Sequence, residues 1–156
     1  MWTRGYNLAT DFRPSDYQKS RFAHDLFPKY FKKIKAIPNP KRREVDFHLY
    51  LDDKLVGYAE LEVKFVWKTK EWTNYPNIQF PARKAHFAQT ELPTFMVMFN
   101  SDGSNALIVD AKTMAASPLV NRWTRRGKDF LYQVPLNKVV FGPESFERYV
   151  LERVKK

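Results

Sequence analysis

The sequence predicts a domain of the α/β class, on three observations. Residues 45–66 alternate apolar and polar side chains with a period of two around a short polar break, which is typical of a β-hairpin. Apolar runs at 94–100 and 105–111, joined by the turn SDGS, predict two further strands. Helix-start signals at Ser15 and Pro143 predict helices before and after these strands.

The first helices follow from a cap and a proline. Ser15 is a suitable N-cap, and Asp16 in the first turn suits the positive end of the helix dipole. Pro28 ends this helix, and residues 28–37 are predicted to form a second helical segment that begins with proline. Seven basic residues and no acid lie in the stretch 29–43, which predicts an edge that binds the backbone of a polyanion.

The hairpin has one apolar and one polar face. Residues 45–51 form its first strand, DDK turns the chain, and residues 56–66 form its second strand. Because side chains alternate across a strand, the polar residues of both strands gather on one face. That face carries Asp46 and His48 from the first strand and Glu60, Glu62 and Lys64 from the second.

The remainder of the chain continues the alternation of strands and helices. Residues 68–77 are predicted to be a loop, and a short extended piece leads into a helix that begins at Pro81. Residues 112–128 predict an irregular basic connection. Residues 129–141 are expected to return to the sheet, and residues 143–156 to form a terminal helix.

Composition narrows the class of partner. The chain has 27 Lys and Arg against 17 acids, a net charge of +10 at pH 7, which makes polyanions the default partner. The basic residues are interleaved with aromatics and no amphipathic anchoring helix stands out, which favours nucleic acid over a membrane surface. There is no cysteine for disulfides or thiolate metal sites, and no apolar stretch long enough to span a bilayer. With no internal repeat or long linker, we expect one soluble, cytoplasmic domain over residues 1–156.

Two carboxylates and a lysine converge on the polar face of the predicted hairpin. Facing side chains of antiparallel neighbours lie about 5 Å apart, so we expect Asp46 to approach Glu62 and Lys64. Carboxylate oxygens suit Mg²⁺ or Mn²⁺. Such an ion polarises a phosphoryl oxygen and lowers the pKa of a bound water, and Lys64 orients that water or neutralises developing charge. The sequence therefore predicts metal-assisted hydrolysis of a phosphodiester.

The letters VD at 45–46, the hairpin turn and ELEVK at 60–64 resemble the PD-(D/E)xK nuclease superfamily, which includes restriction enzymes, junction resolvases and phage recombination exonucleases. The resemblance covers roughly residues 15–110 in element order. It implies a restriction-endonuclease-like fold, in which helices flank a mixed central β-sheet. It also implies that the enzyme is a Mg²⁺-dependent deoxyribonuclease, structure-selective or non-specific, with Asp46 and Glu62 as metal ligands and Lys64 as the catalytic lysine.

The chain departs from the superfamily motif at one position, and the identity of a further acid from the first helix stays open. Val45 stands where proline is frequent. Some members add an acid from the first helix, for which this chain offers either Asp16 or Asp25. Such a minimal nuclease suits a phage, and hence the cytoplasm of a host cell, and resolvases of the superfamily often act as homodimers.

Basic and aromatic residues beside the motif are the predicted DNA contacts. Arg83 and Lys84 lie near the start of a helix similar to the one that supplies basic or amide groups in the superfamily, where a phosphate is welcome. Aromatic residues near the site are either core residues or platforms for unpaired bases: Trp67, Trp72 and Tyr75. Further candidates for nucleic-acid binding are Arg42, Arg43, Arg125 and Arg126.

Other interpretations of the same residues stay open. Glu60, Glu62 and Lys64 alternatively form a solvated strand face with a cross-strand pair to Asp46, and Glu60 is expected to be a surface or supporting acid. His48 is expected either to contact a ligand or to be structural, and His24 and His86 are expected to be surface or helix-packing residues. The protein is then a non-catalytic basic nucleic-acid-binding protein, or an interaction protein whose basicity is incidental.

Overall fold

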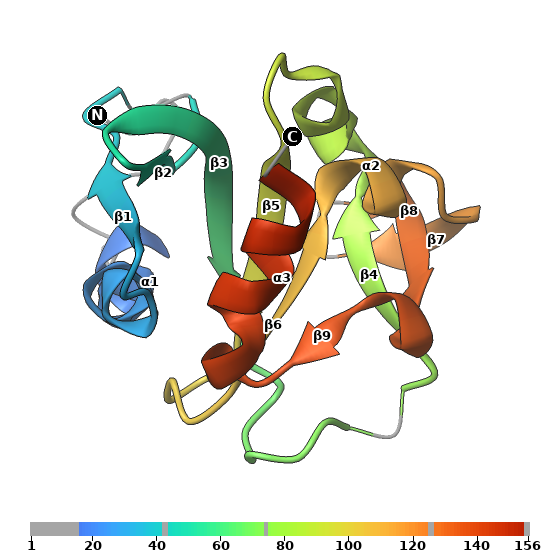
Figure 1. The fold of residues 1–156 in the computed structure, drawn as a ribbon. Coiled ribbons are helices and arrows are strands. Elements are labelled where there is room, and N and C mark those ends of the chain that lie inside the picture. The colour runs from blue at the N-terminus through green and yellow to red at the C-terminus, as the bar shows by residue number, and fades with distance from the viewer. Residues whose placement is uncertain (1–15, 42–43, 74, 125–126, 155–156) are drawn as a thin grey trace, which may run out of the picture.

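The computed structural model describes residues 16–41, 44–73, 75–124 and 127–154, with the side chains of residues 21–41, 44–73, 75–123 and 127–154. The predicted α/β class is confirmed (Figure 1). The helices are α1 (Asp16–Leu26), α2 (Ala111–Ala115) and α3 (Phe146–Val154), with the 3-10 helices η1 (Phe27–Tyr30), η2 (Ala82–Gln89), η3 (Leu136–Lys138) and η4 (Pro143–Ser145). The strands are β1 (Ile34–Pro38), β2 (Phe47–Leu51), β3 (Lys54–Val63), β4 (Asn77–Pro81), β5 (Thr94–Phe99), β6 (Ala106–Asp110), β7 (Leu119–Thr124), β8 (Gly127–Pro135) and β9 (Val140–Phe141).

The central sheet has six strands in the order β1-β2-β3-β5-β6-β9. It is mixed, because β3 and β5 pair in parallel while the other neighbours pair antiparallel. A parallel pair needs a long crossover, and here residues 64–93, which include β4 and η2, supply it. The mixed sheet expected from the resemblance is therefore present.

The predicted hairpin is confirmed as β2 and β3. Asp52 and Asp53 form its turn with φ values of 52° and 64°, the left-handed geometry whose twist matches that of two antiparallel strands. Phe47 and Ala59 face each other across the ladder, and both belong to the larger hydrophobic cluster. Because side chains alternate across a strand, the neighbours of Phe47 and Ala59, residues 46, 48, 58 and 60, point to the face opposite this cluster.

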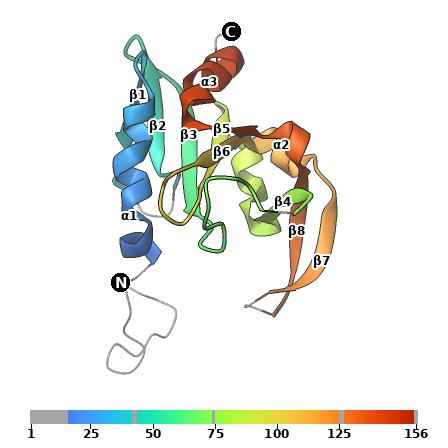
Figure 2. The same cartoon turned by 90° about the horizontal axis from the view of Figure 1, so that it is seen from below.

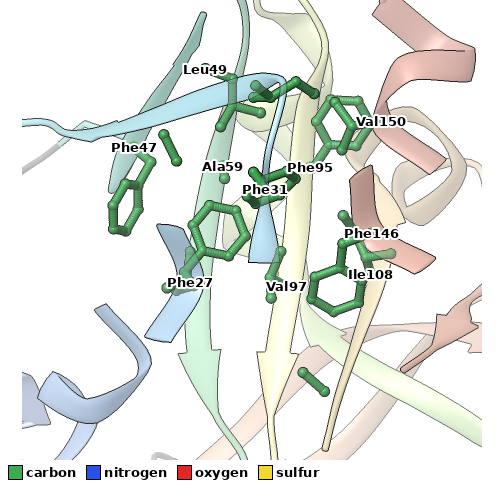
Figure 3. Close-up of a cluster of buried hydrophobic side chains, with 14 of the residues drawn as sticks. Phe27, Phe31, Phe47, Leu49, Ala59, Phe95, Val97, Ile108, Phe146 and Val150 are labelled. Atoms are coloured by element: carbon green, nitrogen blue, oxygen red, sulfur yellow. The ribbon is translucent and has the colours of Figure 1, made fainter. Parts of the chain in front are cut away.

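Two hydrophobic clusters cover the two faces of the central sheet. Strand β5 is buried along its whole length because Phe95, Val97 and Phe99 pack into one cluster, while Met96 and Met98 pack into the other. The first cluster joins the sheet to α1, η1 and α3, and its labelled side chains interleave in Figure 3. The second cluster joins the sheet to β4, η2, α2 and β8. Figure 2 shows α1 and the β4-β8-β7 sheet on opposite sides of the molecule.

The predicted second helical segment over 28–37 is wrong. Only the short η1 is helical, and β1 follows it as the edge strand of the central sheet. Ile34 and Ala36 are buried while Lys35 is exposed, a strand pattern, and charged side chains are typical of an edge strand. The carboxylate of Glu147 in α3 accepts the N–H groups of residues 32, 33 and 34 at 2.7–3.0 Å and fixes the entry to this strand.

The predicted irregular connection over 112–128 is also wrong. It contains α2 and β7, and β7 pairs with β8 in a second sheet of three strands, ordered β4-β8-β7. Of residues 129–141, only β9 returns to the central sheet. The ladder of β7 uses backbone groups, and the mostly exposed sequence LVNRWT has no regular alternation of apolar and polar residues.

Several other predicted elements are confirmed. Helix α1 ends at Leu26, before Pro28, and η2 begins after Pro81, although as a 3-10 helix. The strands β5 and β6 are joined across residues 101–104, and α3 follows Pro143 by one short turn. No helix within the described ranges is long and apolar enough to cross a membrane.

Candidate functional site

The acids of the hairpin gather where β2 meets β3. Ala59 and Leu61 point into the first cluster, so Glu60 and Glu62 point to the other face of β3. Asp46 lies just before β2, and the Phe47–Ala59 register places it beside Glu60. Its Oδ2 accepts the N–H of Leu61 at 2.8 Å, which ties this carboxylate to β3.

Lys84 lies against two of these carboxylates. Its Nζ is 3.6 Å from Glu60 Oε2 and 3.3 Å from Glu62 Oε1. The side chains of Lys84, Glu60 and Glu62 are 16%, 17% and 29% exposed, so these ion pairs are largely shielded from water. Helix η2 thus brings Lys84, which is 22 positions beyond Glu62 in the chain, into contact with the glutamates. The sequence predicted that Lys84 contacts a phosphate. Asp46, Glu60, Glu62 and Lys84 are called the carboxylate cluster below.

The electrostatics of the carboxylate cluster follow from its burial and from its like charges. Burial, then the charge of Asp46, and then that of Glu62, raise the pKa of Glu60 to about 7, although Lys84 opposes them. Burial acts to lower the pKa of Lys84, but Glu62 and Glu60 together hold that pKa above its ordinary value. Glu60 Oε1 is buried and accepts no hydrogen bond from the described residues. A buried carboxylate oxygen without a hydrogen-bond partner is costly for the folded protein.

Lys64, the predicted catalytic lysine, lies directly after β3. The backbone N–H of Lys64 donates to Phe99 O at 2.8 Å, which continues the pairing of β3 with β5 by one residue. Its Nζ lies 6.0 Å from the centroid of the Tyr75 ring. The structure therefore brings Asp46 and Glu62 to one site with Lys84. Among the described residues it shows no ion pair between Lys64 and these carboxylates.

The contact from the first helix is a histidine. His24 Nε2 lies 3.4 Å from Asp46 Oδ1, and its ring stacks on Phe47 with the centroids 5.6 Å apart. Asp25 is exposed, and the side chain of Asp16 lies outside the described residues. The expectation of a surface or packing role for His24 overlooked its contact with Asp46, because a helix-to-sheet contact leaves no local pattern.

The predicted DNA contacts have different surroundings. Arg83 is half exposed and pairs with Asp129 at 3.7 Å. Trp67 is fully buried, donates from Nε1 to Glu71 O at 2.8 Å and packs edge-on against Trp72, so the suggestion that it stacks on bases is wrong. Tyr75 is 57% exposed and stays a candidate. Arg42, Arg43, Arg125 and Arg126 lie outside the described residues.

The carboxylate cluster fits a hard divalent cation by the chemistry of its donors. Asp46, Glu60 and Glu62 offer the oxygen ligands that Mg²⁺ prefers, and Glu60 Oε1 lacks a partner. Within the described ranges, no three His, Cys, Asp or Glu side chains are already arranged to hold a metal. The ammonium of Lys84 supplies the positive charge instead. A cation would compete with Lys84 for the two glutamates.

No family model, curated protein or solved structure matches this chain. The geometry of the carboxylate cluster is thus the basis for assigning its chemistry. The carboxylate oxygens of the cluster are donors that suit a cation, and the raised pKa of Glu60 allows it to bind a proton near neutral pH.

Proposed function

We propose that this protein is a metal-dependent nuclease that hydrolyses phosphodiester bonds in DNA, with a PD-(D/E)xK active site on a restriction-endonuclease-like sheet. The observation that carries the proposal is the convergence of Asp46, Glu60 and Glu62 in a largely buried position, where one buried oxygen of Glu60 accepts no hydrogen bond from the described residues. Evolution tolerates clustered, desolvated like charges chiefly where a function requires them.

The roles of the residues follow from their positions. Asp46, Glu60 and Glu62 would hold Mg²⁺ or Mn²⁺, which supplies Lewis acidity toward the phosphodiester when bound. Lys64 keeps the catalytic role that the resemblance implies, because it is the lysine that closes the motif on β3. Lys84 neutralises the glutamates of the metal-free protein. When a cation displaces the Lys84 ammonium from the glutamates, a DNA phosphate offers that ammonium another anionic partner.

The charge of the chain supports DNA as the substrate. The net charge of +10 attracts a polyanion, and binding through phosphate neutralisation weakens steeply with added salt. The mixed sheet supports the architecture that the superfamily uses, because the two motif strands are an antiparallel hairpin whose second strand pairs in parallel with β5.

A second candidate function is non-catalytic binding of nucleic acid. It is favoured by the ion pairs of Lys84, since Glu60 and Glu62 already have a counter-charge without a metal. In that case the carboxylate cluster is a structural ion-pair network.

The test is cleavage of labelled single-stranded, duplex, flap and four-way-junction DNA with Mg²⁺, with Mn²⁺ and with EDTA. Wild type is compared with Glu62→Gln and Lys64→Ala, and with Glu71→Gln as the control, since Glu71 is an exposed loop glutamate. We expect metal-dependent products from wild type and from the control, and a loss of at least about hundredfold in the two site variants. Salt-sensitive binding without products from any substrate would instead establish the non-catalytic binder.

A further inference from the structure

A cavity of about 480 Å³ adjoins the carboxylate cluster. Its lining includes Tyr58 from β3, His48 from β2, and His86 and Phe87 from η2. Tyr58 lies two residues before Glu60 on the same face of β3, and His86 lies two residues after Lys84 on η2. The cavity and the carboxylate cluster are therefore built on the same two elements, β3 and η2, and Tyr58 and Glu60 are about 7 Å apart along the strand.

The lining of the cavity suits a flat aromatic ligand. His48 and Tyr58 face each other in the ladder with their rings in an edge-on contact, centroids 5.6 Å apart. His86 and Phe87 form a second ring pair, with centroids 4.1 Å apart. Ring faces of this kind stack on nucleobases, and the volume lies within the range of small-ligand sites.

The polar groups of the cavity are mainly acceptors. Glu44 and Glu91 line it, and ionised carboxylates only accept hydrogen bonds. His86 Nδ1 lies 3.0 Å from Arg83 O, and because a carbonyl can only accept, Nδ1 carries the hydrogen. In the neutral ring Nε2 is then an acceptor as well. Two carboxylates make the cavity unfavourable for a phosphate and favourable for a ligand with amino N–H donors.

We propose that this cavity is a nucleobase subsite, which takes the base of the nucleotide next to the phosphate at the carboxylate cluster. The base stacks against Tyr58 and His86 and donates its exocyclic amino group to Glu44 or Glu91. Cytosine, adenine and guanine carry such a group and thymine does not, so the subsite discriminates against thymine. The proposal rests on the proposed nuclease function for the identity of its ligand.

The experiment has a readout that needs no cleavage. Amide and ring resonances of the protein in EDTA are followed by NMR during titration with deoxycytidine, deoxythymidine and deoxyribose. We expect deoxycytidine to shift the resonances of Tyr58, His48, His86 and Phe87, deoxythymidine to bind at least about fivefold more weakly, and deoxyribose to shift none of them. Shifts confined to other regions, or equal for deoxyribose, would overturn the subsite.

Variants and abasic substrates link the cavity to catalysis. His86→Ala is the main variant because His86 is exposed, and Gln89→Ala, also exposed on η2, is its control. Tyr58→Leu is a second variant, used after its fold is checked by circular dichroism. We expect His86→Ala to weaken deoxycytidine binding at least about fivefold and the control to leave it unchanged.

The same proteins are given oligonucleotides with one abasic position moved along the strand. With the wild-type protein, we expect an abasic site at one position beside the cleaved phosphate to lower kcat/KM relative to the intact oligonucleotide. With His86→Ala, we expect the same abasic site to have no effect on kcat/KM. Cleavage that is insensitive to every abasic position, together with no shifts in the cavity, would overturn the subsite and leave the nuclease standing. Nucleoside shifts in the cavity without cleavage of any DNA would support the subsite and overturn the nuclease.

Discussion

We predict that the negative charge of Glu60 lowers the free energy of unfolding of the metal-free protein. The Glu60→Gln variant removes this charge and should therefore be more stable than wild type at high pH. Burial and the charges of Asp46 and Glu62 raise the pKa of Glu60 from an ordinary 4.5 to about 7, against the opposing effect of Lys84. A group whose pKa is higher in the folded than in the unfolded protein contributes its stability fully below the unfolded value. That contribution is lost as the pH rises through the folded value.

The size of the effect follows from the two pKa values. The interval from 4.5 to about 7 corresponds to a loss of about 3 kcal/mol in the free energy of unfolding as the pH rises across it. The Glu60 side chain is 17% exposed, so solvent screens little of this. A glutamine of the same shape carries no charge at any of these pH values. We therefore expect Glu60→Gln to match wild type near pH 4 and to exceed it by up to about 3 kcal/mol at pH 8.

The assay is urea unfolding in EDTA at several pH values between 4 and 8, for wild type, Glu60→Gln and Glu71→Gln. The exposed Glu71 controls for the loss of one negative charge, and its variant should stay within about 0.5 kcal/mol of wild type. A difference between wild type and Glu60→Gln that does not change with pH would refute the reasoning. So would a wild type that gains stability over the variant as the pH rises.

Three further predictions concern the same cluster and the edge of the sheet. Mg²⁺ at about 100 times its dissociation constant should raise the unfolding free energy of wild type at pH 8 by about 3 kcal/mol, and that of Glu62→Gln by much less, measured by urea unfolding. Equal effects on both proteins would exclude the glutamate as a ligand. Lys84→Met should cost about 3 kcal/mol in EDTA because it leaves two shielded carboxylates unpaired, whereas Lys138→Met, at an exposed position, should be neutral within about 0.5 kcal/mol. Glu147→Ala removes the acceptor of three backbone N–H groups and should cost about 2–4 kcal/mol by urea unfolding, against less than about 0.5 for Glu152→Ala on the same helix; equal costs for the two glutamates would contradict the anchoring role.

Local patterns were enough for the elements whose signals lie within their own residues. The hairpin of β2 and β3 follows from alternation, β5 from an unbroken apolar run, and the end of α1 from Pro28. Alternation along β3 also predicts that Glu60 and Glu62 share one face, whereas the register that sets Asp46 beside Glu60 came from the structure.

Elements that depend on a distant partner were missed. Strand β1 exposes Lys35 and Ile37, and its entry is fixed by the carboxylate of Glu147, 113–115 residues further along the chain. Strand β7 is exposed and mixes apolar with polar residues without regular alternation, so its ladder to β8 in a second sheet is not predicted by periodicity. The helical propensity of residues 28–37 was outweighed by the pairing of β1 with β2 and by the N–H groups that Glu147 accepts.

The sequence by itself determined the α/β class, the motif strands, and the charge that favours a polyanion. Only the tertiary structure decided that Glu60 is a shielded acid with an unpartnered oxygen, that Lys84 joins it, and that His24 contacts Asp46. The physical reason is that the face on which a side chain lies depends on its own strand. Its burial and its counter-charges depend on segments from elsewhere in the chain: η2 packs over the face of Glu60 and Glu62, and α1 reaches Asp46 just before β2 through His24.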